Sequence, residues 1–315
     1  MDILLVEDNP ATRQIVRDIL QETPYDITAY GNGNEGYTAI DNQGWDLIIL
    51  DIMLPGKDGY ELLGFSKKIH KFTPVIMFTA LKDRNKKIKA YNMGVNDFIS
   101  KPVEKWEFLA RVRSLLALRE SYQKLEETKN IVKSLAHAVE AKDPYTSGHS
   151  DRVGKYCKKI ALKVGFSEEK AEDLYWAGLL HDIGKIAVPL DILTKPGKLT
   201  EEEYKRVKEH PKVSHKICKD LRTLQKVLPA VKYHHERWDG KGYPSGLAGK
   251  EIPVEARIMS VADAFDAMTS DRSYRKALSR QKALRILKEE KNKQFQGTIV
   301  DTLLEILDKK TIEND

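Results

Sequence analysis

Hydrophobic and polar positions divide the chain into two parts with different patterns. In the first 118 residues, short apolar runs alternate with segments of helical periodicity. The apolar runs cover residues 3–6, 27–30, 47–50, 75–78 and 98–99. A doubly wound parallel sheet with helices on its faces produces this alternation. We therefore predict an α/β domain with a five-stranded parallel sheet over residues 1–118.

A segment without proline or glycine, from about residue 104 to 142, predicts one long helix between the two parts. Its apolar residues follow the heptad pattern of a coiled coil. The a positions are Leu115, Tyr122, Lys129 and Ala136, and the d positions are Leu118, Leu125, Val132 and Val139. A polar residue at one a position, here Lys129, can set the register and oligomeric state. We interpret residues 119–136 as a linker that forms a parallel homodimer; the alternative is an amphipathic helix packed on its own domains.

Residues 137–315 contain mostly helical patterns and predict an all-α domain. Thr200 and Glu203 have the spacing of a capping box, which predicts the start of a helix that carries His210. Pro211 is expected to bend that helix beside the histidine. The Lys- and Glu-rich helices near the carboxyl terminus are interpreted as solvated surface.

Polar side chains follow the predicted strands at the points where the strands end. Glu7 and Asp8 follow the first strand, Asp51 follows the third, and Thr79 and Lys101 follow the fourth and fifth. The carboxyl ends of parallel strands meet at one edge of the sheet, so these side chains should lie close together. Their carboxylates make a hard oxygen site for Mg²⁺. Asp51 can then act as the nucleophile that forms an aspartyl-phosphate.

These residues, together with the segments LLVEDNP and ILDIMLPG, resemble the flavodoxin-like receiver domain of two-component response regulators. The resemblance implies that Asp51 accepts a phosphoryl group from a partner histidine kinase. It also implies that Mg²⁺ is bound by Glu7, Asp8 and the backbone carbonyl of Met53. Thr79 and Lys101 are expected to sense the phosphoryl group, and Phe98 to occupy the aromatic switch position. For Phe98, simple packing in the strand core is an almost equal alternative to a switch role.

Paired histidines run directly into a glycine-rich turn at residues 234–244, in the sequence HHERWDGKGYP. Neighbouring side chains on a helix point about 100° apart, so His234 and His235 would more readily serve two neighbouring ions than one. Other short motifs supply further candidate ligands: His149 in GHSDRV, His181 and Asp182 in LLHDIGK, His210 in KEHP and Asp263 in VADAFDAM. A polar pair such as His181-Asp182 at the end of an apolar stretch is costly to bury without a partner or a metal. The motifs together predict a metal site.

The motifs HDIGK at 181–185, HHERWDGKGYP at 234–244 and SVADAFDAMTSDRSYR at 260–275 resemble the HD-GYP phosphodiesterases of the HD superfamily. That family degrades cyclic di-GMP, and the resemblance covers residues 137–315. It implies that the metal ligands are His149, His181, Asp182, His210, His234, His235 and Asp263. Asp182 is expected to bridge the metals, and Lys185 to act beside it in catalysis. Substrate is expected to contact Lys185, Arg272, Arg275, Gly242 and Tyr243.

The resemblance has one departure, at the position four residues before the first histidine. Tyr145 stands where some members carry a glutamate that helps to hold a third metal. We therefore predict a dinuclear site, and a mixed histidine and carboxylate shell suits iron or manganese. Two such cations activate a bridging water for attack on phosphorus. The expected first product is linear pGpG, and a second cut would give GMP.

Composition and charge indicate which classes of partner the chain is expected to bind. The formal net charge is +6, and the excess of basic residues falls after residue 120, which suits an anionic substrate. We see no basic stripe interleaved with aromatic residues and expect no DNA binding. No apolar run reaches about 20 residues, so no membrane insertion is expected. The chain starts in a strand without a signal peptide, and its two cysteines form no disulfide framework, so a cytoplasmic protein is expected.

These inferences lead to one prediction and two alternatives. We predict a phosphorylation-regulated response regulator that hydrolyses cyclic di-GMP, with a GGDEF-domain protein as a further partner. One alternative is a sensor that binds a cyclic dinucleotide with little turnover. The other is a phosphodiesterase for another cyclic dinucleotide, such as cyclic GMP-AMP, because the motifs do not specify the base.

Overall fold

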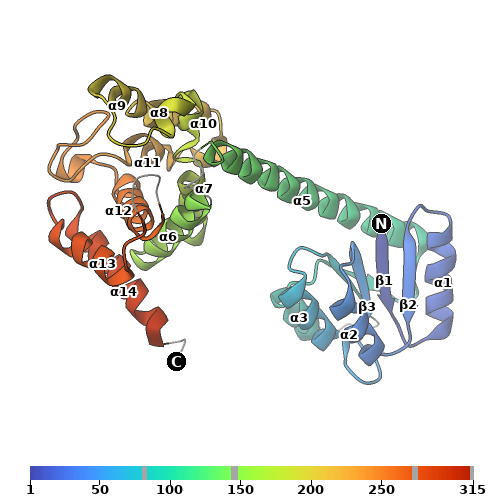
Figure 1. The fold of residues 1–315 in the computed structure, drawn as a ribbon. Coiled ribbons are helices and arrows are strands. Elements are labelled where there is room, and N and C mark those ends of the chain that lie inside the picture. The colour runs from blue at the N-terminus through green and yellow to red at the C-terminus, as the bar shows by residue number, and fades with distance from the viewer. Residues whose placement is uncertain (80–83, 143–147, 272–275, 313–315) are drawn as a thin grey trace. The chain divides into compact units, whose positions relative to one another are not determined.

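A computed structural model describes residues 1–79, 84–142, 148–271 and 276–312. Tyr145, Arg272 and Arg275 lie outside the described residues. The chain forms two compact units, residues 1–129 and 130–315, and each unit is described by itself (Figure 1).

The first unit alternates strands and helices around one sheet (Figure 1). The strands are β1 (Asp2–Val6), β2 (Asp26–Tyr30), β3 (Leu47–Asp51), β4 (Val75–Thr79) and β5 (Asp97–Ser100). The helices are α1 (Pro10–Gln21), α2 (Gly33–Asn42), α3 (Gly59–Ile69), α4 (Arg84–Asn92) and the start of α5 (Lys105–Glu140). All strand pairs are parallel, and the order is β2-β1-β3-β4-β5. The predicted five-stranded, doubly wound sheet is confirmed.

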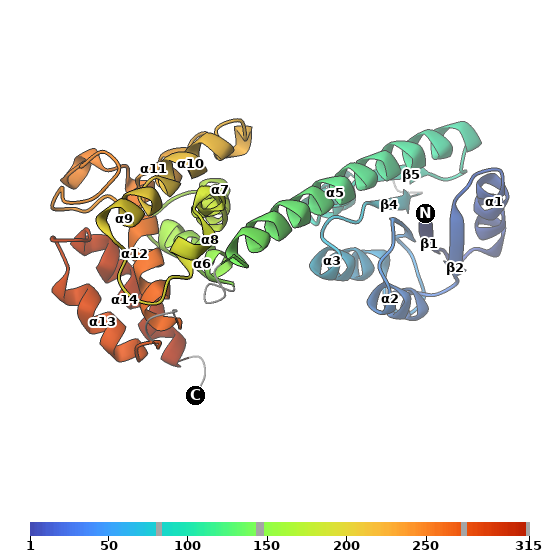
Figure 2. The ribbon, with the colours of Figure 1, turned by 45° about the horizontal axis from the view of Figure 1, so that its top comes forward.

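Side chains that alternate along each strand pack against helices on opposite faces of the sheet. On β1, Leu4 and Val6 belong to the core cluster that also contains side chains from α2 and α3. Ile3 and Leu5 point into the other cluster, with side chains from α1 and α5. Both layers are apolar because a parallel sheet is covered on both faces. Figure 2, a turned view of the molecule, shows β4, β5 and α5 in this unit.

Helix α5 confirms the long helix expected over residues 104–142. Its first turns pack on the sheet through Phe108, Val112 and Leu116, which are buried. Its last turns belong to the second unit, where Ala136 is buried in the core and Val132 packs against it. These two heptad positions therefore pack within the chain, as in the alternative of a helix packed on its own domain, whereas Leu125 is exposed.

The described part of the second unit consists of helices, turns and an isolated bridge. Its α-helices are α6 (His149–Lys163), α7 (Glu168–Leu180), α8 (Leu190–Leu193), α9 (Glu201–Val207), α10 (His210–Cys218), α11 (Leu228–Tyr233), α12 (Val254–Thr269), α13 (Arg280–Glu289) and α14 (Gly297–Ile312). Short 3-10 helices are η1 (Ile183–Ala187), η2 (Arg222–Leu224) and η3 (Gly249–Glu251). The predicted all-α domain is confirmed. In the described ranges, no helix combines the length and apolar character that a membrane crossing needs.

One helix prediction needs correction. Thr200 does form a capping box with Glu203, but the helix that it starts, α9, ends at Val207. His210 begins a separate helix, α10, with Pro211 in its first turn. Proline lacks an amide hydrogen, so it is tolerated where a helix begins and breaks one that continues. His210 therefore lies at a helix start, instead of beside a bend within a helix.

Candidate metal centre and phosphoacceptor site

The carboxyl edge of the sheet brings together the acids predicted at the strand ends. Glu7 and Asp51 are buried, and Lys101 lies between them. Lys101 Nζ donates to Asp51 Oδ2 at 2.7 Å and to Glu7 Oε1 at 2.9 Å. Carboxylate oxygens of Glu7, Asp8 and Asp51 lie within 4.8 Å of one another. This all-oxygen donor set fits a hard cation such as Mg²⁺.

The electrostatics of this edge are those of a cation site. Burial raises the pKa of the Glu7 carboxyl, and the Asp51 charge adds to this effect, whereas Lys101 opposes it. Burial disfavours the charged form of Lys101, but its hydrogen bonds to Asp51 and Glu7 outweigh burial and raise its pKa. The ammonium group of Lys101 thus partly neutralises the Glu7 and Asp51 carboxylates, which are also the groups that would bind a cation.

The other predicted receiver residues surround this edge. Asp8 is exposed, Thr79 is buried at the end of β4, and the Met53 side chain is 69% exposed. Phe98 is buried in the core, with its ring edge-on to Tyr91 at 5.2 Å between centroids. That burial is what the core-packing alternative for Phe98 describes.

Helix ends in the second unit bring the predicted ligands into one cluster. His149 begins α6, His181 follows α7, His210 begins α10, and His234 and His235 follow α11. Asp182 follows His181, and Asp263 lies within α12. The five histidines and Asp182 are at least partly buried, and rings of neighbouring members lie 4.1–5.4 Å apart. All seven predicted ligands thus come together from distant parts of the sequence.

A glycine in the HDIGK motif allows this close approach. A Cβ added to Gly184 would lie 2.2 Å from the His210 carbonyl oxygen. The Gly184 amide also donates to Ser214 Oγ at 2.8 Å. The segment η1 therefore packs directly on the start of α10, and this contact brings Asp182 to His210.

Four of the histidine rings are oriented by a hydrogen bond at Nδ1. The Nδ1 atoms of His181, His210 and His234 lie 2.6–2.8 Å from the carbonyl oxygens three residues earlier. His149 Nδ1 instead lies 2.7 Å from Asp266 Oδ2. An Nδ1–H that donates to such an oxygen leaves Nε2 as the free ligand atom. The rings therefore present Nε2 to the centre of the cluster.

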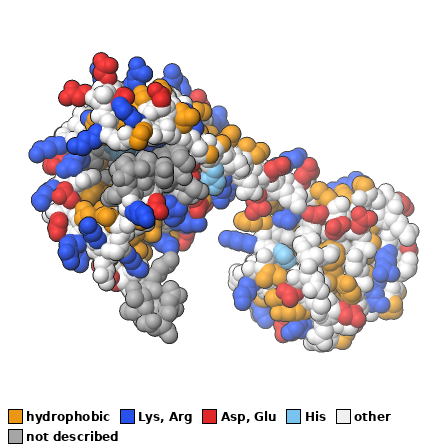
Figure 3. Space-filling view, in the orientation of Figure 1, with side chains coloured by type: hydrophobic (Ala, Val, Ile, Leu, Met, Phe, Trp, Pro, Cys, Tyr) orange, Lys and Arg blue, Asp and Glu red, His pale blue; other side chains and the backbone are white. Residues whose placement is uncertain are grey.

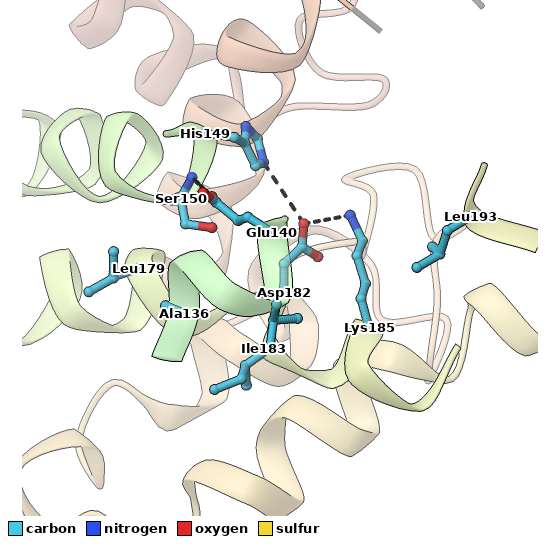
Figure 4. A pocket seen from close by; sticks show the side chains of 10 residues that line it. Ala136, Glu140, His149, Ser150, Leu179, Asp182, Ile183, Lys185 and Leu193 are labelled. Atoms are coloured by element: carbon cyan, nitrogen blue, oxygen red, sulfur yellow. Dashed lines mark hydrogen bonds and ion pairs between the residues drawn. The ribbon is translucent and has the colours of Figure 1, made fainter. Parts of the chain in front are cut away.

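Asp182 lies between two sides of the cluster. Its Oδ1 is 3.1 Å from His210 Nε2, whereas its Oδ2 is 3.3 Å from His181 Nε2 and 3.9 Å from His149 Nε2. Oδ2 also accepts a hydrogen bond from Lys185 Nζ at 2.6 Å (Figure 4). The chain forms a 3-10 helix from Ile183 to Ala187, and Lys185 thereby reaches Asp182, three residues earlier.

Burial and the neighbouring charges set the protonation of the cluster. Burial, with the nearby His210 charge, lowers the pKa of His235 to about 3, and the pKa of His234 is also well below its ordinary value. Burial would raise the pKa of Asp182, but the charges of His181 and Lys185 lower it well below its usual range. His234 and His235 are therefore neutral imidazoles and Asp182 is an ionised carboxylate, which are the states in which such groups bind metals. Burial would lower the pKa of His149, but its hydrogen bonds to Asp263 and Asp266 raise it to about 9, so this ring must lose a proton when it binds a metal.

The donor atoms form two groups that fit metal ions. Ligand atoms of His149, His181 and Asp182 lie within 4.8 Å of one another, and those of His210, His234 and His235 form a second such group. Both adjacent histidines thus reach one group, although their spacing suggested two separate ions. Within the described residues, the buried His181 Nε2 has no hydrogen-bond partner, although Asp182 Oδ2 lies 3.3 Å away. A metal ion would satisfy that nitrogen.

Two buried acids that support the cluster were not predicted from the sequence. Asp266 is 1% exposed and binds both His149 Nδ1 and Arg152 Nε, at 2.7 and 2.6 Å. Burial opposes its ionisation, but the hydrogen bonds from His149 and Arg152 lower the pKa of Asp266. Its position three residues after Asp263, on the same face of α12, is the signal that could have found it.

The second acid is Glu236, which is 2% exposed and organises the glycine-rich loop. Its carboxylate accepts hydrogen bonds from the amides of Ser245, Gly246 and Leu247 at 2.7–3.1 Å. Its place between the paired histidines and the loop was the available signal. Glu236 thus joins the loop to the predicted metal ligands His234 and His235.

The loop residues predicted to contact substrate also pack on a predicted metal ligand, His235. The Tyr243 amide donates to the His235 carbonyl oxygen at 3.2 Å, and the Tyr243 ring lies 4.7 Å from the His235 ring. A Cβ added to Gly242 would lie 2.4 Å from the Arg237 nitrogen. Glycine is therefore needed at 242 for close packing, whereas Gly240 has a positive φ of 76°. The loop holds His235 in place.

The fold and the two sites define a class of protein: a receiver-like domain joined to a helical domain with a metal centre. Residues 3–113 match the response regulator receiver domain family, and residues 133–299 match the HD domain family. The chain belongs to the response regulators that carry a receiver domain followed by an HD domain, and its second domain is that of a metal-dependent phosphodiesterase. The family expected from the motifs is confirmed.

Three relatives show the range of this similarity. The cyclic di-GMP phosphodiesterase response regulator RpfG of Xanthomonas campestris pv. campestris is 33% identical, over 96% of this chain and 87% of the relative. A cyclic di-GMP phosphodiesterase of Thermotoga maritima is also 33% identical, over 97% of this chain and 90% of the relative. The 3'3'-cGAMP-specific phosphodiesterase 2 of Vibrio cholerae is 38% identical, over 57% of this chain and 35% of the relative.

Proposed function

We propose that the chain hydrolyses cyclic di-GMP to linear pGpG under the control of phosphorylation at Asp51. The position of Asp182 carries the hydrolytic part of this proposal. Its two carboxylate oxygens face different histidines, with Oδ1 near His210 and Oδ2 near His181. A carboxylate in this position can bridge two cations, and paired cations are typical of enzymes that cleave phosphodiesters.

Two iron or manganese ions suit the proposed site, because its donors are imidazole nitrogens and carboxylate oxygens. The residues that would hold them are His149, His181, Asp182, His210, His234, His235 and Asp263. When bound, the ions would supply an activated water and neutralise charge on the phosphodiester. The absence of a glutamate at Tyr145 supports a count of two, and a site of two ions favours stopping at pGpG.

The chain's own residues would position the substrate and its charge. Lys185, through its 2.6 Å contact with Asp182 Oδ2, fixes that carboxylate and places a positive charge beside the attacked phosphate. On the side of His235 and Asp263, a cavity of about 330 Å³ is also lined by Lys208 and Lys241. Cations in such a cavity stabilise the charge that grows on phosphate oxygens in the transition state. Gly242 and Tyr243 line the same cavity, and with Arg272 and Arg275 they complete the proposed substrate contacts.

The receiver would supply the control. In our proposal, a histidine kinase phosphorylates Asp51, with Mg²⁺ held by Glu7, Asp8 and the Met53 carbonyl. Lys101, which already contacts both Asp51 and Glu7, would then follow the phosphoryl group, together with Thr79. Phosphorylation changes a local charge, and it acts on the second domain only if it favours one of two arrangements of the chain.

A homodimer through the middle of α5 and a GGDEF-domain partner belong to the same proposal. Leu118 and Leu125 of the heptad pattern are 39% and 52% exposed. Because Val132 and Ala136 pack within the second unit, the proposed contact is limited to the turns around Tyr122. Sedimentation of the full chain with and without a phosphoryl mimic tests it: a monomer in both conditions would contradict the dimer.

A second candidate substrate is cyclic GMP-AMP. The 3'3'-cGAMP-specific phosphodiesterase 3 of Vibrio cholerae is 43% identical over 50% of this chain, which is a higher identity than that of the cyclic di-GMP enzymes. Two cyclic di-GMP enzymes, those of Xanthomonas campestris and Thermotoga maritima, match nearly the whole chain, including the receiver. The longer match favours cyclic di-GMP.

One experiment separates the candidates. The full chain, loaded anaerobically with iron or manganese, is incubated with cyclic di-GMP or 3'3'-cGAMP, and linear dinucleotides and mononucleotides are resolved by chromatography. We expect pGpG from cyclic di-GMP at a rate that exceeds the cleavage of cyclic GMP-AMP. The reverse preference would reassign the substrate, and binding without hydrolysis under both metals would indicate a sensor.

A further inference from the structure

The last turn of α5 contacts the chain on both sides of the first metal ligand. Glu140, the final residue of the helix, is 9% exposed. Its carboxylate accepts a hydrogen bond from the amide of Ser150 at 2.5 Å (Figure 4). It also accepts one from the amide of Gly148 at 3.1 Å, and Gly148 and Ser150 flank His149. The start of α6 leaves amides without helical partners, and Gly148 has no side chain to cap them. Glu140 supplies that cap from another helix.

A second residue after α5 holds the segment that carries Asp182. Lys142 Nζ donates to the carbonyl oxygens of Ile186 and Val188, both at 3.0 Å. These carbonyls lie at the end of η1, directly after Lys185. Glu140 and Lys142, two residues apart, therefore hold the two segments that carry His149 and Asp182.

The other end of the same helix is part of the receiver core. Phe108 and Val112 are fully buried against the sheet, and Phe108 lies 6.3 Å from Phe78, between ring centroids. Phe78 precedes Thr79 on β4, at the edge where Asp51 and Lys101 meet. The same continuous helix, α5, connects this buried start to Glu140, and its backbone hydrogen bonds join each turn to the next.

We propose that Glu140 is a positioning residue of the metal centre and that α5 makes it the point where the receiver acts on catalysis. This proposal rests on the proposed function. Glu140 touches no reacting atom; it fixes the backbone around His149, and Lys142 adds the matching contact beside Asp182. A small displacement of the last turn of α5 would loosen one metal ligand and leave the fold of the domain intact.

Lys and Arg side chains are scattered among acidic ones on the face of each unit shown in Figure 3. The contacts of Glu140 and Lys142, in contrast, link specific backbone atoms to specific metal ligands.

The test measures metal release, which does not depend on substrate. Full-length chains loaded with Mn²⁺ are mixed with a chelating dye, with and without beryllium fluoride as a phosphoryl mimic. The variants are Glu140→Gln, which removes the charge and one acceptor, and the control Glu127→Gln, an exposed glutamate on the same helix. We expect Glu140→Gln to release metal about tenfold faster than the wild type, and Glu127→Gln to match the wild type. Beryllium fluoride should change the release rate of the wild type and the control, and leave Glu140→Gln unchanged.

Two results would overturn the proposal: release from Glu140→Gln at the wild-type rate, or a wild-type response of that variant to beryllium fluoride. No response of the wild type would overturn the regulatory part in the same way. If Glu140→Gln does not melt cooperatively, Lys142→Met is judged by the same criteria, because it removes only the contacts to Ile186 and Val188. A chain that shows the expected release pattern and hydrolyses no cyclic dinucleotide would contradict the proposed function and still support the role of Glu140.

Discussion

The two candidate cation sites differ in what their donor atoms contact within the chain. At the receiver edge, Lys101 Nζ lies 2.7 Å from Asp51 and 2.8 Å from Glu7, so a protein cation already contacts the carboxylates. In the helical unit, the donors are buried imidazoles, and rings such as His149 are held at Nδ1 by a hydrogen bond. A metal ion at the first site would share the carboxylates with Lys101, whereas at the second site it would meet donor atoms that are already oriented.

This difference arises from the local chain geometry. The receiver acids each follow a separate strand, and their positions depend on the pairing of the whole sheet. His181, His210 and His234 stand at helix ends, where the carbonyl three residues earlier is close enough to accept from Nδ1. We therefore expect Mg²⁺ at the receiver to exchange readily, and the metals of the helical unit to be retained through purification.

Loss of Asp182 is the most severe test of this comparison. In Asp182→Asn, an NH₂ group replaces one of the two carboxylate oxygens, and the side chain can no longer bridge two cations. We expect hydrolysis to fall by about 10³-fold or more, which corresponds to roughly 4 kcal/mol of transition-state stabilisation. Metal content measured by mass spectrometry should fall with it.

The receiver supplies the control for that variant. Phosphorylation of Asp51 by a small phosphodonor should proceed in Asp182→Asn at the wild-type rate, because the two sites belong to separate units. Full metal content together with hydrolysis within tenfold of the wild type would show that Asp182 does not bridge the metals.

Loss of Asp266 tests how strongly the orientation of a ligand ring, here His149, affects metal affinity. Asp266→Asn removes the charge that accepts from His149 and Arg152, and leaves every proposed metal ligand in place. Partners of this kind contribute about 10- to 100-fold to metal affinity. Metal titration of the variant should show a loss in that range, and Asp191→Asn, an exposed control, should show none. Unchanged affinity would mean that the rest of the cluster orients His149 without Asp266.

Much of the fold could be predicted because it depends on local patterns. Alternating apolar runs predicted the five strands, and a stretch without proline or glycine predicted α5. The boundary between α9 and α10 was missed, because a proline such as Pro211 is compatible with either a bend or a new helix start.

The proposed metal ligands were predicted from motifs, whereas their supporting residues were not. Asp266, Glu236 and Glu140 are three of the 47 Asp and Glu residues of the chain. Asp266 and Glu236 lie close in sequence to predicted ligands, but that position alone does not distinguish a buried acid from an exposed one. Their roles depend on backbone amides or rings that distant segments bring to them. Such contacts exist only after the helices have packed.

A smaller effect is expected when the receiver loses its phosphoacceptor. In Asp51→Asn, Lys101 keeps Glu7 as a partner, but no aspartyl-phosphate can form. Coupling between two sites is typically about 1–3 kcal/mol, so phosphorylation should change the wild-type hydrolysis rate by about fivefold or more. The ratio of rates with and without a small phosphodonor should be about one in Asp51→Asn and unchanged in the exposed control Asp41→Asn. A variant ratio equal to that of the wild type would show that the helical unit responds to the phosphodonor by another route.

The smallest effect concerns a second lysine of the receiver, which lacks the carboxylates that surround Lys101. Lys67 Nζ donates to the neutral acceptors Thr73 O and Asn96 Oδ1, and burial lowers its pKa to about 8. The unfolded chain keeps the ordinary, higher pKa, so between about pH 8 and pH 10 it binds more protons than the folded chain. The free energy of unfolding of the receiver should therefore rise with pH in this window, and Lys67→Met should remove that rise. The measurement is a urea titration of both proteins at several pH values, in which hydrogen exchange of peptides from β1 and β3 monitors unfolding of the receiver. It gives the difference in the free energy of unfolding between the wild type and Lys67→Met. A difference that does not vary with pH would show that Lys67 is as well compensated as Lys101.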